Sequence, residues 1–235
     1  MDALASKPDL TAQAHHAIRE AIMAMDLAPG TPLAQEDLAE RLGVSRQPVS
    51  HALVLLRREG LVVDRGRKGQ MVAPIDPDRL LALYQVRGAI DRLAARLATA
   101  RLATDRLATD RLATAGRDPV ENPAKRFERL IEDGREACAG GEIDALVKAD
   151  LAFHQAIHAL SGNDEIERTA AGFWPHMVRS MRVVLEDSKG RDAIWDEHAA
   201  IAEAILSGDP AKAGSLAADH AERTGELTHQ RLSRP

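Results

Sequence analysis

In the first third of the chain, apolar positions recur with a helical period in three stretches. Residues 10–27 carry apolar side chains three and four positions apart, the pattern of an amphipathic helix. A second stretch stops at Gly43 and a third at Gly60, because glycine readily adopts the left-handed conformation that ends a helix. Ser45 occupies the N-cap position of the third stretch, and Pro48 falls in its first turn, where a missing N–H costs little. The pattern predicts a helix followed by a helix-turn-helix.

After Gly60 the pattern changes to two short apolar runs around a basic, glycine-rich tip. The runs are residues 61–63 and 71–73, and the tip between them reads Asp-Arg-Gly-Arg-Lys-Gly. Short apolar runs on either side of such a tip predict a β-hairpin. Three helices and a hairpin together predict a winged helix-turn-helix.

From about residue 78 to the C-terminus the period is helical, with no strand pattern. Breaks rich in Gly, Ser, Asn and Pro divide this region into a long first helix and five more, at about 123–139, 143–160, 164–185, 191–206 and 210–232. The fold class predicted is mainly α, an N-terminal winged helix-turn-helix (three helices plus a β-hairpin wing) followed by an all-α helical bundle. The boundaries predicted are a flexible tail 1–8, a DNA-binding domain 9–75, a proline-containing linker 76–79 and an all-α domain 80–235.

Residues 96–115 hold four copies of a five-residue unit, Arg-Leu-Ala-Thr followed by Ala or Asp. Five residues turn about 140° around a helix, so successive leucines build no single stripe. We interpret the unit as a tandem duplication tolerated as a helix extension or a mobile loop. A contact arm is the alternative.

The chain has a net charge of −5, yet residues 41–68 hold seven Arg or Lys against two acids. Phosphate binding needs local positive charge rather than a basic protein. Arg46 and Gln47, at the start of the second helix of the motif, can bond guanine and adenine edges. The DNA contacts expected are Ser45, Arg46, Gln47, Ser50, His51, Arg65, Arg67, Lys68 and Gly69. The alternative is a helical hairpin whose solvated charges serve protein contact.

Composition narrows the class of protein further. The single Cys138 excludes an internal disulfide and fits a reducing cytoplasm. No signal-peptide run occurs at the N-terminus, and no uninterrupted apolar run is long enough to span a membrane. We therefore expect a cytoplasmic protein without a membrane partner.

Four side chains in the all-α region are candidate metal ligands. Asp150 and His154 share a helix face because they are four residues apart, and His198 and His220 lie in two other helices. If these helices meet, three imidazoles and a carboxylate converge on a site suited to Zn²⁺, Ni²⁺, Mn²⁺ or Fe²⁺. On sequence alone His158, one turn beyond His154, serves equally well.

The N-terminal motif resembles the winged helix of the GntR family of bacterial transcription regulators. The resemblance rests on LAERLGVSRQPVSHAL, LRREGLV and GRKGQMVAP. It implies that Arg46 and Gln47 read bases and that Gly69 is the glycine of the wing. The family often has Arg directly after its Pro-Val pair, where this chain has Ser50 followed by His51, so its operator contacts are expected to differ.

The C-terminal region resembles the FadR-type C-terminal domain (FCD) of the same family. The matching segments are Asp150-Leu-Ala-Phe-His154, Glu197-His198-x-x-Ile201 and His220. The resemblance implies a divalent metal, Zn²⁺ or Ni²⁺ ahead of Mn²⁺ or Fe²⁺, held by Asp150, His154, His198 and His220. It also implies that Arg87 faces the pocket and pairs with the carboxylate of an effector; a helix-surface ion pair is the alternative. Where the family usually has Glu four residues after this arginine, the chain has Asp91.

Together these features predict a homodimeric transcription regulator. As a repressor it would bind an inverted-repeat operator in double-stranded DNA, and a small organic acid near the metal would modulate that binding. One alternative is a metal-dependent hydrolytic or lyase enzyme acting on a carboxylic acid, for which Glu197 is the only adjacent general base. Another is a structural nucleoid protein without sequence preference or ligand.

Overall fold

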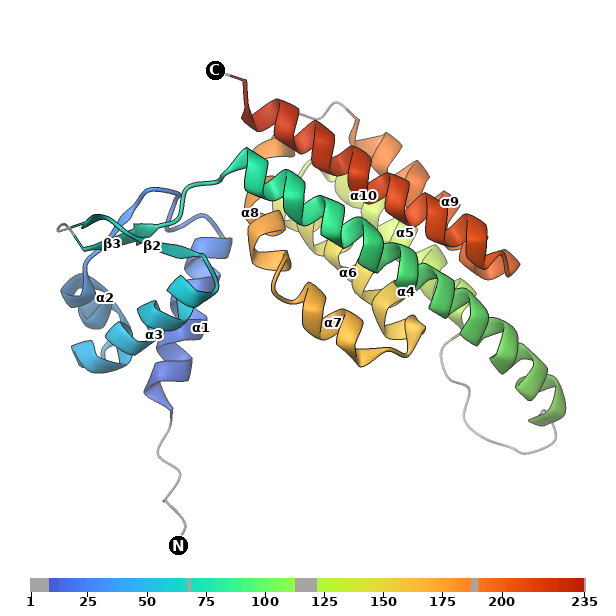
Figure 1. The fold of residues 1–235 in the computed structure, drawn as a ribbon, viewed down its shortest axis with the longest axis horizontal. Helices are drawn as coiled ribbons and strands as arrows, with labels where there is room; N and C mark the ends of the chain where they lie inside the picture. Colours follow the sequence, from blue (N-terminus) through green and yellow to red (C-terminus); the bar gives the residue numbers. More distant parts are fainter. Residues whose placement is uncertain (1–8, 67–68, 113–121, 187–189, 235) are drawn as a thin grey trace, which may run out of the picture. The chain divides into compact units, whose positions relative to one another are not determined.

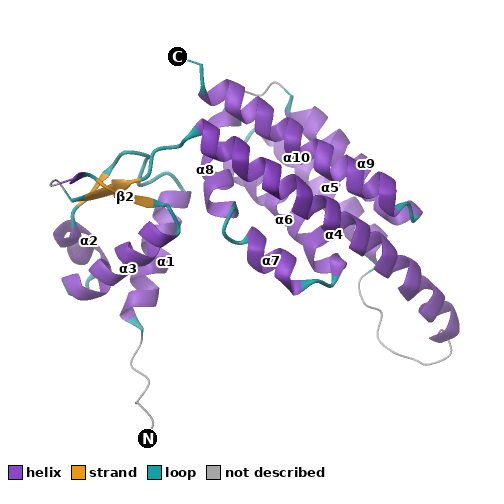
Figure 2. Cartoon of the chain, viewed as in Figure 1, coloured by secondary structure: helices purple, strands orange, loops and turns teal. Residues whose placement is uncertain are grey.

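The computed structural model describes residues 9–66, 69–112, 122–186 and 190–234, with the backbone alone for 105–112. Contacts between residues divide the chain into two compact units, Met1–Ile75 and Asp76–Pro235. The described residues form ten helices and three short strands (Figures 1 and 2). All three strands belong to the first unit.

The first unit is a three-helix domain with a small antiparallel sheet. Its elements are α1 (Leu10–Met23), β1 (Pro32–Leu33), α2 (Gln35–Leu42), α3 (Arg46–Arg58), β2 (Val62–Asp64) and β3 (Gln70–Val72). The strands pair in the order β1-β3-β2, with Val62 opposite Val72. The apolar faces of the helices meet in one core that includes Ile18, Ile22 and Leu53. The α2–turn–α3 segment is thus held by a domain with its own core.

Local conformation explains where these elements begin and end. Gly43 has a φ of 64° and ends α2, after which Ser45 takes the N-cap position of α3. Helix α1 ends at Met23 rather than near Leu27, because Met25 has a φ of 67°, outside the range of a right-handed helix. The predicted two-stranded wing has a third strand, β1. A two-residue strand is too short to show a period of two, so the sequence did not reveal it.

The second unit is a bundle in which α4 and α10 lie side by side (Figure 1). Its helices are α4 (Pro77–Leu112), α5 (Pro123–Gly140), α6 (Ile143–Ser161), α7 (Asp164–Ala170), α8 (Trp174–Val184), α9 (Arg191–Ser207) and α10 (Pro210–Leu232). Glycines allow α10 to approach α4 closely. A Cβ on Gly225 would lie 2.5 Å from Cβ of Tyr84, and one on Gly214 would lie 2.7 Å from Cγ of Arg96. Phe153 of α6 lies fully buried in the main core.

Two predicted boundaries in this unit are wrong. Residues 76–79, expected to be a linker, are the N-cap and first turn of α4. Asp76 Oδ1 accepts hydrogen bonds from the backbone N–H groups of Asp78 and Arg79 at 3.0 and 3.1 Å, and Pro77 fits the first helical position.

The single helix expected at 164–185 is divided into α7 and α8. Pro175, near the start of α8, has no N–H to continue a preceding helix.

The repeat region continues α4 as a helix to Leu112. Ala98 and Leu102, four residues apart, are buried in the main core with exposed fractions of 0% and 8%. Thr99 is also buried, and its hydroxyl donates to the carbonyl of Ala95 at 2.8 Å. The repeat thus continues α4 as a helix extension, one of the two predicted forms, and its first copy and part of the second belong to the core. Residues 113–115 lie outside the described part of the chain.

Replacing Leu102 by alanine is expected to lower the free energy of unfolding by about 2–3 kcal/mol, because it leaves a cavity at the edge of the core. Deleting residues 101–105 is expected to change the free energy of unfolding little. The deletion moves the next Arg-Leu-Ala-Thr-Asp unit into the same positions, so Leu107 replaces Leu102. Urea unfolding of both variants measures the two effects. A deletion as destabilising as Leu102→Ala would show that the length of α4, rather than its buried side chains, matters.

Candidate metal centre and DNA-binding surface

Three helices of the bundle bring the four predicted metal ligands together. Helix α6 supplies Asp150 and His154, α9 supplies His198 and α10 supplies His220. One ligand atom from each residue lies within 4.8 Å of the others. The three histidines are buried, with exposed fractions of 3%, 0% and 2%, so the cluster is inside the bundle.

The nitrogens and the carboxylate oxygen of this cluster face one another. Nε2 of His198 lies 3.2 Å from Nε2 of His220 and 3.6 Å from Oδ1 of Asp150. Nε2 of His154 lies 3.9 Å from the same carboxylate oxygen and is buried without a hydrogen-bond partner among the described residues. Buried polar atoms normally have partners. A cation at the centre of the cluster would supply one.

Glu197 orients one of these imidazoles. Its Oε2 accepts a hydrogen bond from Nδ1 of His220 at 2.7 Å and also pairs with Arg223. Burial alone would raise the pKa of Glu197, but the hydrogen bonds from His220 and Arg223 hold it below its ordinary value, so the carboxylate is ionised. With the proton of His220 on Nδ1, Nε2 presents a lone pair to the cluster, as a metal ligand must.

Burial also sets the charge of two other ligands. It lowers the pKa of His154 and of His198 well below the ordinary value, and the positive charges of Arg87 and the neighbouring imidazoles act in the same direction. Both imidazoles are therefore neutral at neutral pH, the form that binds metal. The ring of His198 is further fixed by stacking on Phe153, with centroids 4.3 Å apart.

His158, the alternative ligand in the sequence, lies outside the cluster. Its Nε2 bonds Oδ1 of Asp91 at 2.9 Å and its Nδ1 bonds Oε2 of Glu167 at 3.3 Å, so both nitrogens are engaged. Asp91 in turn forms a buried ion pair with Arg87, whose Nε lies 3.0 Å from Oδ2. These contacts therefore favour His154 over His158 as the metal ligand.

Arg87 forms the ion pair that the alternative predicted, with Asp91 one turn further along α4, but the pair is buried rather than on the helix surface. Arg87 is 3% exposed, and its guanidinium lies 4.9 Å from the ring centroid of Trp174. Burial would raise the pKa of its partner Asp91, but the charge of Arg87 and the hydrogen bond from His158 lower it, so the pair is ionic. Nη2 of Arg87 is buried without a partner among the described residues. One donor therefore stays available to a ligand.

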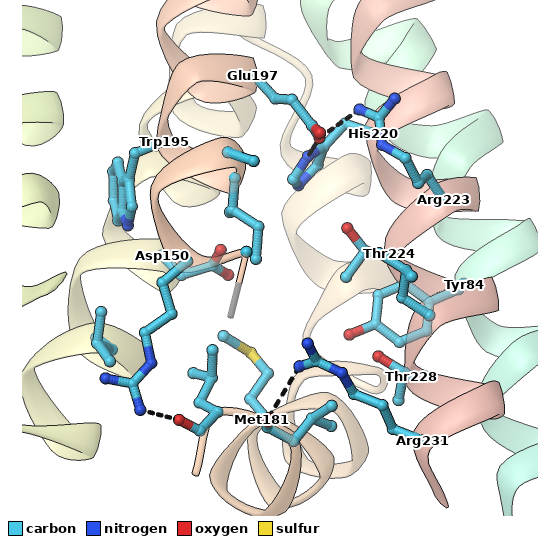
Figure 3. A pocket seen from close by; sticks show the side chains of 18 of the residues that line it. Tyr84, Asp150, Met181, Trp195, Glu197, His220, Arg223, Thr224, Thr228 and Arg231 are labelled. Atoms are coloured by element: carbon cyan, nitrogen blue, oxygen red, sulfur yellow. Dashed lines mark hydrogen bonds and ion pairs between the residues drawn. The ribbon is translucent and has the colours of Figure 1, made fainter. Parts of the chain in front are cut away.

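A cavity of about 230 Å³ opens from the cluster between α4, α6, α8, α9 and α10 (Figure 3). Asp150, His220, Arg87 and Tyr84 line it beside the metal centre. An engineered cavity of about 150 Å³ is large enough for benzene, so this one can hold a small organic molecule. The sequence predicted a role in the pocket for Arg87 but assigned none to Tyr84. Their separation of three residues on one helix, which places them on a shared face, was a usable signal.

The candidate DNA contacts lie on the surface of the first unit. Ser45, Arg46, Gln47 and His51 are exposed at the start of α3, and Ser50 is half-buried. Arg46 pairs with Glu36 at 2.6 Å, with both side chains about two-thirds exposed. In the wing, Arg65 and Gly69 are exposed, and the N–H of Arg65 donates to the carbonyl of Gly69 at 2.7 Å. Arg67 and Lys68 lie outside the described residues.

The fold and the site define a two-domain DNA-binding regulator, and comparisons with known proteins agree. The pattern of bacterial regulatory proteins of the gntR family matches residues 10–72, and that of the FCD domain matches residues 110–223. The chain belongs to the GntR family and carries an FCD domain. Among the helices that the structure describes, none has both the length and the apolar character needed to cross a bilayer.

Three similar proteins illustrate the relationship. An uncharacterized HTH-type transcriptional regulator of Streptomyces ambofaciens is 29% identical over 82% of this chain and 73% of its own length. The HTH-type transcriptional repressor RspR of Escherichia coli is 30% identical over 62% of this chain and 56% of its own, so the match spans little more than half of that relative. The solved structure of E. coli McbR/YncC shares the fold, with a TM-score of 0.74, 18% identity, and coverage of 98% of this chain and all of that one.

These relatives settle the class of protein. The family and the named relatives are transcription regulators, so the chain is a regulator and the alternative of a metal-dependent enzyme is wrong. Glu197, considered as a general base for that enzyme, is engaged by His220 and Arg223 instead.

Proposed function

We propose that this regulator represses transcription as a homodimer and that a small organic acid, bound beside a divalent metal in the FCD domain, releases it from its operator. The observation that carries the proposal is the cluster of three imidazoles and one carboxylate beside the cavity. Two relatives, RspR and a probable D-xylose utilization repressor of Paenarthrobacter nicotinovorans, are named repressors.

The donor set suits Zn²⁺ or Ni²⁺, with Mn²⁺ or Fe²⁺ as further candidates. Asp150, His154, His198 and His220 would hold the ion. One carboxylate and three neutral ligands leave a divalent cation with net positive charge, which attracts an anion. The buried Nη2 of Arg87 would donate to the carboxylate of such an acid.

The winged helix supports operator binding through residues at the start of α3 and in the wing. Arg46 and Gln47 would contact base edges, while Ser45, Ser50, His51, Arg65, Arg67, Lys68 and Gly69 would contact the backbone or flanking groups. In a homodimer, each winged helix would bind one half of an inverted repeat. The acid would act by favouring a dimer arrangement that does not match the half-site spacing.

Native mass spectrometry of protein purified without chelator or affinity-metal resin tests the assembly. The result expected is a mass of two chains plus one divalent ion per chain, with any bound acid as additional mass. A dimer that takes up no ion after addition of Zn²⁺, Ni²⁺ or Mn²⁺ would remove the metal from the proposal. A monomer would contradict the dimeric regulator.

Glu197→Gln is expected to lower the affinity for Zn²⁺ about 10- to 100-fold, the usual effect of removing a carboxylate that orients a metal-bound histidine. The amide is a weaker acceptor for the Nδ1 proton of His220. Glu203→Gln, an exposed position on the same helix, is the matched control and is expected to have no effect. Competition with a fluorescent chelator measures both affinities. Equal affinities for the two variants would mean that Glu197 does not support the site.

A further inference from the structure

The cavity beside the metal centre has a second, cationic end. On α10, His220 and Arg231 both line the cavity, and their separation of eleven positions corresponds to about 16 Å along the helix. On α9, Arg191 also lines it and precedes His198 by seven residues, about 10 Å. Figure 3 shows Arg231 at the opposite end of the cavity from His220 and Glu197. We name Gly190, Arg191 and Arg231 the distal end.

The contacts of Arg191 leave its charge available. One Nη donates to the carbonyl of Leu185, while Nε is buried and has no hydrogen-bond partner among the described residues. Nη1 of Arg231 donates to the carbonyl of Val184 at 3.0 Å. Both carbonyls belong to the C-terminal end of α8, so one structural role of these arginines is to cap that helix. A carbonyl is neutral, however, and no described carboxylate forms an ion pair with Arg191.

The N-terminus of α9 adds further positive potential at the distal end. This 17-residue helix begins after Gly190, whose φ is 87°, and no side chain among the described residues caps it. Gly190, Ala193 and Ile194 line the cavity, so the first turn lies at its wall. The free N–H groups and the dipole of a helix N-terminus favour an anion. Together with the guanidinium groups, they form a set of donors that suits the carboxylate of a ligand long enough to reach them.

The part of the cavity between its two ends is mainly apolar, although the side chains of Tyr84, Thr224 and Thr228 also line it (Figure 3). Leu146, Met181, Ile194 and Leu227 line this middle part. At the metal end, Nη2 of Arg87 lacks a partner although the side chain is only 3% exposed. A ligand that fills the whole cavity therefore carries an acceptor at each end and a mainly hydrocarbon chain between them.

From this arrangement we infer that the effector is a linear dicarboxylate. One carboxylate lies at the metal end beside Arg87, and the other lies on Arg191 and Arg231 at the N-terminus of α9. The inference rests on the proposed function for the metal end, and it adds the second anionic group and the mainly apolar spacer.

Isothermal titration calorimetry of full-length, Zn²⁺-loaded protein tests the inference. The probes are succinate, adipate and suberate, each paired with the monocarboxylate of the same length, namely butyrate, hexanoate and octanoate. At least one dicarboxylate is expected to bind about 10- to 100-fold more tightly than its partner, since hydrogen bonds to a charged group contribute about 1.5–3 kcal/mol. Arg191→Gln is expected to remove this preference without changing the affinity for the monocarboxylate.

Two further variants control for folding and position. Arg231→Gln tests the distal end without altering α9 and is expected to weaken the preference in the same direction. Arg135→Gln is the matched control, because Arg135 is an exposed arginine paired with Asp196 at 3.1 Å and does not line the cavity. It is expected to retain the full preference.

The outcomes separate this inference from the proposed function. Equal binding of mono- and dicarboxylates that still depends on Zn²⁺ would overturn the dicarboxylate and leave the acid-binding metal centre standing. A preference that survives in both Arg191→Gln and Arg231→Gln would also overturn it. Absence of binding by all six acids to Zn²⁺-loaded protein would contradict both the inference and the proposed acid effector.

Discussion

His154→Ala is expected to lower the affinity of the protein for Zn²⁺ by more than about 100-fold. Loss of a partner that only orients a ligand costs about 10- to 100-fold, and loss of a ligand itself costs more. In the structure, Nε2 of His154 is buried, lacks a partner among the described residues and faces the carboxylate of Asp150. Competition with a chelating dye under anaerobic and aerobic conditions measures the affinity for Zn²⁺ and, separately, for Fe²⁺.

The same variant is expected to bind operator DNA as tightly as the metal-free wild type. The winged helix has a core of its own within the first unit, so removing a side chain from the FCD domain leaves that core intact. His229→Ala is the control. His229 is on α10, but it is not part of the cluster, and its Nε2 lies 2.8 Å from Oδ1 of Asp78. A variant His154→Ala with wild-type Zn²⁺ affinity would exclude this histidine as a ligand.

Arg46→Ala is expected to weaken binding to the operator by about 1–3 kcal/mol, which corresponds to roughly 5- to 150-fold, and to relax base preference at one position. Arg46 is the first residue of α3 and two-thirds exposed, so its guanidinium can reach a base edge once DNA replaces its ion pair with Glu36. Fluorescence anisotropy with operator and random duplexes measures both affinities. Binding to random DNA is expected to change much less.

Glu36→Gln provides the control for this interpretation. It removes the carboxylate that holds Arg46 in the free protein and leaves the arginine in place. Its operator affinity is therefore expected to equal or exceed that of the wild type. If Arg46→Ala weakens binding to operator and random DNA equally, Arg46 contacts phosphate and does not read a base.

Local signals were sufficient to predict the winged helix. Gly43 requires a left-handed conformation, Ser45 occupies an N-cap position, and Val49 and Leu53 share an apolar face, so each step of the motif is specified by residues close in sequence. The strand β1 was missed because its two residues become a strand only by pairing with β3, almost forty residues later.

Local spacing predicted only part of the metal cluster. The spacing of Asp150 and His154 places them on one helix face, but only the packing of α6 against α9 and α10 decides which other histidines join them. His158 fits the same helix face by spacing. Its contacts with Asp91 on α4 and Glu167 on α7, which no local pattern reveals, are what direct it elsewhere.

Burial was the least predictable property. Arg87 carries a full charge and would be expected at a surface, yet the ion pair with Asp91 and the ring of Trp174 allow it to be buried. The repeat region illustrates the reverse. A five-residue period gives no continuous apolar stripe, but Ala98 and Leu102 are four residues apart and meet the core because α4 lies along the bundle at that point.

The most direct test of the central claim is the operator affinity of metal-loaded and metal-stripped protein, each measured by fluorescence anisotropy with and without the acid that binds most tightly. In the metal-loaded protein, the acid is expected to weaken operator binding about 5- to 150-fold, the usual range of coupling between two sites. In the metal-stripped protein, it is expected to have no effect. Operator affinity that is the same with and without the acid in the metal-loaded protein would contradict the account.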